Sequence, residues 1–127
     1  MYVLEAAIGS VPGFVELSHE GLHDNLSWGS QTVRVAQGVP IVTIDDAVSV
    51  VPNAELFIVK IDIEGFEHDL FRENVGWIDR ATMIIVEPHD WLLPGRRTSK
   101  FLQKEMGQRD FDLFICDENL VYVRSDV

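Results

Sequence analysis

The chain has 127 residues, of which 46% are hydrophobic, and 21 acidic against 10 basic side chains give a formal net charge of -11. A chain of this length buries one core, so we expect a single domain over residues 1–127. Its negative field repels phosphate backbones and anionic lipids, which argues against nucleic acid and membrane surfaces as partners. With one cysteine, no secretory signal and no run approaching the ~20 apolar residues of a membrane helix, the sequence predicts a cytoplasmic protein.

Apolar runs of strand character alternate along the chain with a few amphipathic segments. We predict strands at residues 3–8, 14–17, 40–44, 56–62, 82–87, 111–116 and 120–124, and helices at 45–51, 66–74 and 99–108. Residues 18–38 show no sustained period, which predicts a long loop. His19 and His23 in that loop have helical spacing without a helical pattern, so we expect them to be exposed loop residues.

Two of the runs, 56–62 and 82–87, are nearly continuous stretches of hydrophobic residues, as in parallel strands that are covered on both faces. The helix 66–74 between them is the expected crossover. Only residues 117–119 separate the last two strands, which is too short for a crossover and predicts an antiparallel hairpin. The sequence therefore predicts an α/β fold with a mostly parallel sheet that ends in a C-terminal antiparallel hairpin.

Acidic side chains follow the first of these parallel strands. Asp62 ends the strand, Glu64 lies near the start of the next helix, and Gly65 lets a ligand or a neighbouring backbone come close. Carboxylates at the carboxyl edge of a parallel sheet are typical of functional sites. Helix capping is the alternative interpretation, since acids before a helix are common.

The next parallel strand ends in Glu87, and His89 follows it two residues later. Adjacent parallel strands end at the same edge, so we expect Asp62, Glu64, Glu87 and His89 to lie near one cleft. A histidine there can act as a base near neutral pH. A structural role for Glu87 and a solvated His89 is one alternative. Another is a site for magnesium or manganese, to which imidazole adds a ligand for the latter.

Four segments of the chain, taken in order, resemble the FkbM family of S-adenosylmethionine-dependent methyltransferases. They are residues 40–46, 59–67, 84–89 and 119–124, of which the run Lys60-Ile61-Asp62-Ile63-Glu64-Gly65 is the most specific. The resemblance implies a Rossmann-like class I methyltransferase fold and methyl transfer from S-adenosylmethionine to a hydroxyl of a sugar, polyketide or other natural product. It implies that Asp62 ends the fourth strand and faces the reacting groups, that Glu87 ends the fifth, and that residues 4–9 lie beside the adenine. We expect Asp62 and Glu64 to orient the acceptor, His89 or Glu87 to be the base, and Ala6 and Ala7 to contact adenine.

The chain departs from the family pattern at its start. Family members carry a first strand with a glycine-rich cofactor loop and a second strand ending in an acid, and neither precedes Tyr2. The resemblance therefore implies an incomplete fold, the C-terminal portion of a methyltransferase domain, with strand 56–62 left as an exposed apolar edge. We expect a truncated product of a methyltransferase gene; the alternatives are a chain that a companion chain completes and a non-catalytic strand-edge interaction module. In each case we expect the exposed edge to be paired, most simply by a second copy of the chain as a homodimer. A divalent-metal-dependent hydrolase using the same carboxylates and His89 is the alternative enzyme class.

Overall fold

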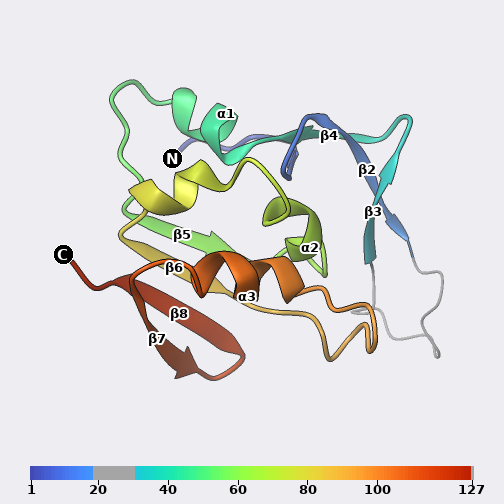
Figure 1. Ribbon diagram of the computed structural model, residues 1–127. Coiled ribbons are helices and arrows are strands. Elements are labelled where there is room, and N and C mark those ends of the chain that lie inside the picture. The colour runs from blue at the N-terminus through green and yellow to red at the C-terminus, as the bar shows by residue number, and fades with distance from the viewer. Residues whose placement is uncertain (19–30, 127) are drawn as a thin grey trace.

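The described residues form two four-stranded sheets with short helices packed between and beside them (Figure 1). The structure is a computed structural model and describes residues 1–18 and 31–126. The strands of the first sheet are β1 (Ala7–Ile8), β2 (Gly13–Ser18), β3 (Gln31–Val35) and β4 (Val39–Val42), in the order β1-β4-β2-β3. β1 and β4 are parallel, whereas β2 is antiparallel to both of its neighbours.

The second sheet carries the C-terminal half of the chain. Its strands are β5 (Ile58–Ile61), β6 (Met83–Val86), β7 (Phe111–Cys116) and β8 (Asn119–Arg124), in the order β5-β6-β8-β7. β5 and β6 are parallel, and β8 lies antiparallel to both β6 and β7. The predicted parallel pair and the predicted C-terminal hairpin are therefore present in this sheet.

The helices are short. They are α1 (Ile44–Ser49), α2 (Glu67–Leu70), the 3₁₀ helix η1 (Val75–Arg80) and α3 (Lys100–Met106). α1 begins with a capping box, because Thr43 and Asp46 each bond the other's backbone N–H through their side chains. α2 has only four residues; it follows a turn in which Glu64 and Gly65 have positive φ, and it ends at Leu70. The predicted crossover helix 66–74 is thus replaced by a single turn of α-helix followed by η1.

Most of the core lies between the second sheet and the helices. Its largest fully buried side chains are Trp77, Phe71, Leu70, Ile78, Ile84 and Leu102. A smaller cluster of Val15, Ile41 and Phe66 joins the first sheet to the start of α2. No helix of the described part is long and apolar enough to cross a membrane.

The predicted fold class is wrong. A Rossmann-like class I methyltransferase fold needs a mostly parallel sheet, but the two sheets are mixed, and four of their six strand pairings are antiparallel. The physical reason lies in the pairings of the remaining strands. Only β5 and β6 are consecutive parallel neighbours joined through helices, as a crossover requires, whereas β2 is antiparallel to both of its neighbours and β8 to both of its own. β1, β2, β3 and β4 form a separate sheet.

Two further expectations fall on the first sheet and on the sheet edge. Residues 18–38, for which the sequence predicts a long loop, contain β3, paired with β2; His19 and His23 lie outside the described residues. β5 is an outer strand of the second sheet; Phe57, just before it, and Ile58, its first residue, are exposed. A homodimer or companion chain at this edge stays a prediction.

Candidate functional site

The candidate site lies where the parallel strands β5 and β6 end. Ile61 is paired with Val86, and the backbone N–H of Glu87 donates a hydrogen bond to the carbonyl of Ile61 over 3.0 Å. Asp62 and Glu87 therefore leave the sheet side by side. Lys60 lies 3.9 Å from Oε2 of Glu87 and donates a hydrogen bond to Asn119 on β8, which leaves Oε1 of Glu87 for the site.

A tight turn carries Glu64 from β5 to the same edge. Glu64 and Gly65 have φ values of 52° and 85°, and Phe66 N–H donates to the carbonyl of Ile63 over 3.0 Å. Positive φ is strained for a glutamate, whereas glycine adopts it freely. Gly65 is also in close contact with its neighbours, because a Cβ at this position would lie 2.7 Å from Cδ1 of Leu93. The turn thus packs against the loop that follows His89.

His89 is the centre of the site and is only 3% exposed. Its Nδ1 lies 2.8 Å from Oε1 of Glu67, a fully buried residue at the start of α2. Its Nε2 faces three carboxylates, at 3.7 Å from Oδ1 of Asp62, 3.9 Å from Oε1 of Glu87 and 4.0 Å from Oε2 of Glu64. The structure therefore brings together the four residues that the sequence selects, and adds Glu67.

The pKa of His89 is raised above its ordinary value. The hydrogen bond with Glu67 is the largest cause; burial of the imidazole acts in the opposite direction, and the charges of Glu67, Glu64 and Glu87 raise the pKa further. The site thus favours a positive charge, on the imidazole or on a ligand, because carboxylates surround it. Asp62 and Glu64 are the accessible members, with about half of each side chain exposed.

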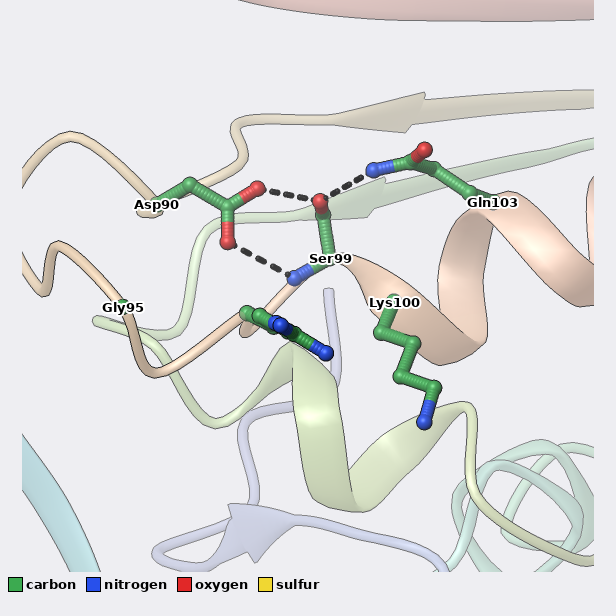
Figure 2. A pocket seen from close by; sticks show the side chains of 6 residues that line it. Asp90, Gly95, Ser99, Lys100 and Gln103 are labelled. Carbon is green, nitrogen blue, oxygen red and sulfur yellow. Dashed lines mark hydrogen bonds between the residues drawn. The ribbon is translucent and has the colours of Figure 1, made fainter.

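The loop after His89 is fixed to the start of α3. Asp90 accepts hydrogen bonds from the backbone and side chain of Ser99, and Gln103 donates to the Ser99 hydroxyl over 2.7 Å (Figure 2). Asp90 also accepts a hydrogen bond from the side chain of Thr98. These hydrogen bonds act against desolvation by burial and lower the pKa of Asp90. Asp90, Ser99 and Gln103 line a cavity of about 390 Å³ together with Gly95, Arg97 and Lys100. This network holds His89 in place from its C-terminal side.

A second network ties the site to the first sheet. Asp69 of α2 accepts hydrogen bonds from the backbone and hydroxyl of Ser10, both at 2.9 Å, and forms an ion pair with Arg34 of β3 at 2.7 Å. Desolvation by burial opposes these partners, which nevertheless lower the pKa of Asp69. The network fixes α2, and with it Glu67, against the first sheet.

Some residues do not join the site. Ala7 lies in β1, pairs with Ile41 and packs against the Val15, Ile41 and Phe66 cluster, and Ala6 precedes it. His68 packs its ring edge-on against Phe101 at 4.8 Å. Sequence reasoning missed Glu67 as a partner of His89, because an acidic residue on a short helix is typically exposed, and nothing in its spacing predicts burial.

The atoms of the site can do two things chemically. Carboxylates and an imidazole can orient a hydroxyl group and accept its proton, and the same atoms are ligands for a divalent cation. Comparisons of the chain with protein-family models, curated proteins and solved structures found no match. The resemblance of its four segments to the FkbM methyltransferases therefore stays a prediction that those residues alone carry.

Proposed function

We propose that the cluster around His89 is the acceptor side of an S-adenosylmethionine-dependent methyl transfer to a hydroxyl group of a sugar or other natural product. One observation supports this most directly. The resemblance assigns Asp62 and Glu64 to the acceptor side, and their carboxylates lie with that of Glu87 within 4.0 Å of Nε2 of His89. The proposal draws nothing from the fold, because the mixed sheets differ from the Rossmann-like sheet that the resemblance implies.

The side chains have separate tasks in this proposal. Asp62 and Glu64 are the most exposed members of the cluster and can accept hydrogen bonds from an acceptor hydroxyl. Nε2 of His89 or the carboxylate of Glu87 accepts the hydroxyl proton as the oxygen becomes a nucleophile. Glu67 stabilises the imidazolium that this transfer produces, through its hydrogen bond to Nδ1.

The described residues offer a place for the sulfonium group of the methyl donor but not for its adenine. S-adenosylmethionine supplies an electrophilic methyl group on a positively charged sulfur, and the carboxylates of Asp62, Glu64 and Glu87 favour a positive charge beside them. Ala6 and Ala7 were the predicted adenine contacts. Ala7 belongs to the first sheet, and no described contact joins it to the carboxylates around His89. The acceptor side of the proposal therefore has geometric support, and the adenine side has none.

A metal-dependent hydrolase is the second candidate. The observation that favours it is that one ligand atom each from Asp62, Glu87 and His89 lies within 4.8 Å of the others. A cation held there can bind water and lower the pKa of that water, which produces a nucleophile at neutral pH. This candidate uses the same residues but needs no methyl donor.

Calorimetric titration of the chain with S-adenosylmethionine tests the proposal. We expect binding, and we expect transfer of label from methyl-tritiated S-adenosylmethionine to members of a panel of monosaccharides and hydroxylated natural products. Asp62→Asn and Glu87→Gln should reduce the transfer. Asp112→Asn removes a charge from an exposed position on β7 and should leave it unchanged. A chain that binds no S-adenosylmethionine and transfers no label contradicts the proposal.

A further inference from the structure

We infer that Asp62, Glu87 and His89 bind a divalent transition-metal cation of the Mn²⁺ type through one carboxylate oxygen each and Nε2 of the imidazole. This inference goes beyond the proposed methyl transfer and stands on geometry that does not depend on it. The three side chains come from the ends of two neighbouring parallel strands, so the sheet itself fixes their backbone positions.

The ligand atoms are nearly close enough to share one ion. Nε2 of His89 lies 3.7 Å from Oδ1 of Asp62 and 3.9 Å from Oε1 of Glu87, and all three atoms lie within 4.8 Å of one another. Ligands about 2.1 Å from a cation are separated by about 3.0 to 3.4 Å at octahedral or tetrahedral angles. Small rotations of the partly exposed Asp62 and Glu87 side chains bring the three atoms to those separations.

The buried imidazole of His89 is a second and independent observation. Its Nδ1 makes a 2.8 Å hydrogen bond to Glu67, but among the described residues its Nε2 makes none, since 3.7 to 4.0 Å is too long. A histidine whose Nδ1–H donates to a carboxylate directs the lone pair of Nε2 outward, which is the arrangement of metal-binding histidines. Nδ1 is thus held by Glu67, whereas Nε2 faces the carboxylates and can bind a cation placed between it and them.

The donor atoms also favour one class of cation. Ca²⁺ takes six to eight oxygen ligands, and Mg²⁺ keeps several waters and binds oxygen almost alone. Two carboxylates and an imidazole suit Mn²⁺ and its transition-metal neighbours better. Asp62 is 48% exposed at its side chain, so water or a substrate oxygen can complete the coordination shell from that side.

Titration of the chelator-treated chain with Mn²⁺ tests the inference, followed by the electron paramagnetic resonance signal of free Mn²⁺ and by calorimetry. We expect one Mn²⁺ per chain and weaker binding of Mg²⁺. Asp62→Asn and Glu87→Gln should each reduce the Mn²⁺ affinity at least about ten-fold. Loss of a residue that only hydrogen-bonds a metal ligand already costs about that much, and loss of the ligand itself should cost no less. Asp112→Asn, which makes the same charge change on β7, should bind Mn²⁺ as the wild type does.

Pulsed electron paramagnetic resonance identifies the imidazole ligand, since bound Mn²⁺ should show a ¹⁴N coupling that His89→Gln abolishes. Thermal unfolding of each variant shows whether it folds. If His89→Gln does not fold, Asp62→Asn and Glu87→Gln, which change partly exposed side chains, still test the inference. The inference is overturned if the chain does not bind Mn²⁺ at millimolar concentration, or if Asp62→Asn and Glu87→Gln bind it with the affinity of the wild type. Neither result bears on methyl transfer, which is measured with S-adenosylmethionine and chelator present.

Discussion

His89 donates a hydrogen bond from Nδ1 to Oε1 of Glu67 over 2.8 Å, and both side chains are buried. The two residues come from different segments, the loop after β6 and the start of α2, so this contact closes the site. Oε2 of Glu67 has no hydrogen-bond partner among the described residues. A buried carboxylate in this state depends on the imidazole for compensation.

Removing Glu67 should therefore destabilise the fold. Glu67→Ala leaves Nδ1 of His89 buried without a partner, and we expect a cost of about 1–3 kcal/mol in the free energy of unfolding. In a double-mutant cycle with His89→Ala, measured by urea denaturation, the pair should show a coupling of about 0.5–3 kcal/mol. Glu118→Ala, in the exposed turn between β7 and β8, is the control and should change stability little. Additive effects of the two substitutions would show that the contact contributes nothing.

Relief of the strained backbone at Glu64 should stabilise the chain. Glu64→Asn places an asparagine, which tolerates left-handed backbone, at φ 52° and creates the Asn-Gly pair that turns of positive φ prefer. We expect the free energy of unfolding, measured by urea denaturation, to rise by up to about 1 kcal/mol. The proposed methyl transfer should weaken, because a carboxylate is lost. Glu55→Asn makes the same chemical change at an exposed position that lacks positive φ, and should give no gain. A loss of stability in Glu64→Asn would mean that its carboxylate supports the fold.

Two glycines allow a matched test of the turn. Gly65→Ala forces a Cβ into backbone of φ +85° and to 2.7 Å from Leu93, so we expect a loss of about 1–3 kcal/mol. Gly76→Ala meets nothing within 4 Å and has no positive φ, so it should be neutral or slightly stabilising. Both are measured by thermal and urea denaturation. An equal free energy of unfolding for Gly65→Ala and Gly76→Ala would exclude a role for the close contact between Gly65 and Leu93.

Asp69 should make stability dependent on acid pH. Its pKa is lowered from 3.8 in the folded chain, so its stabilising effect is complete above the unfolded-state pKa and is lost as pH falls through the lower folded-state pKa. Asp69→Asn should cost about 1–3 kcal/mol at pH 7 because the Arg34 and Ser10 partners lose a charged acceptor. Urea denaturation at pH 7 and pH 3 should show this difference shrinking at the lower pH. A difference of the same size at both would contradict the assignment.

Addition of Mn²⁺ should raise the midpoint temperature of thermal unfolding, and removal by chelator should restore the original value. Binding to the folded state alone stabilises by about 2.7 kcal/mol when the free ion is at one hundred times its dissociation constant. At the same Mn²⁺ concentration the shift should be clearly smaller in Asp62→Asn and unchanged in Asp112→Asn. An equal shift in Asp62→Asn would place the ion elsewhere on this acidic chain.

The sequence predicts the second sheet better than the first. The continuous apolar runs predict the parallel pair β5 and β6, and the three-residue spacer predicts the hairpin of β7 and β8. In the first sheet the predicted strands 3–8, 14–17 and 40–44 overlap β1, β2 and β4. The sheet itself is not predicted, because β3 lies in the expected loop 18–38 and because no local pattern specifies the pairing order. The prediction of a mostly parallel sheet rests on a single βαβ unit, and it is wrong because the other strands pair mostly antiparallel.

The site is predictable at its strand ends and not beyond them. Asp62, Glu64 and Glu87 follow parallel strands, which is enough to expect them at one edge. The positive φ at Glu64 cannot be predicted from a glutamate, and neither can the contact between Glu67, at the start of α2, and His89. The partner that holds the imidazole lies 22 residues earlier in the chain and is acidic, so composition and periodicity both predict it to be exposed.

The ends of β5 and β6 assemble a ligand site around Nε2 of His89 if a crystal of the chain grown with Mn²⁺ holds the ion there. With diffraction data collected at the manganese absorption edge, we expect one anomalous peak within bonding distance of Nε2 of His89 and of carboxylate oxygens of Asp62 and Glu87. An anomalous map with no peak at this position, or a direct hydrogen bond between Nε2 and a carboxylate in its place, rules the site out.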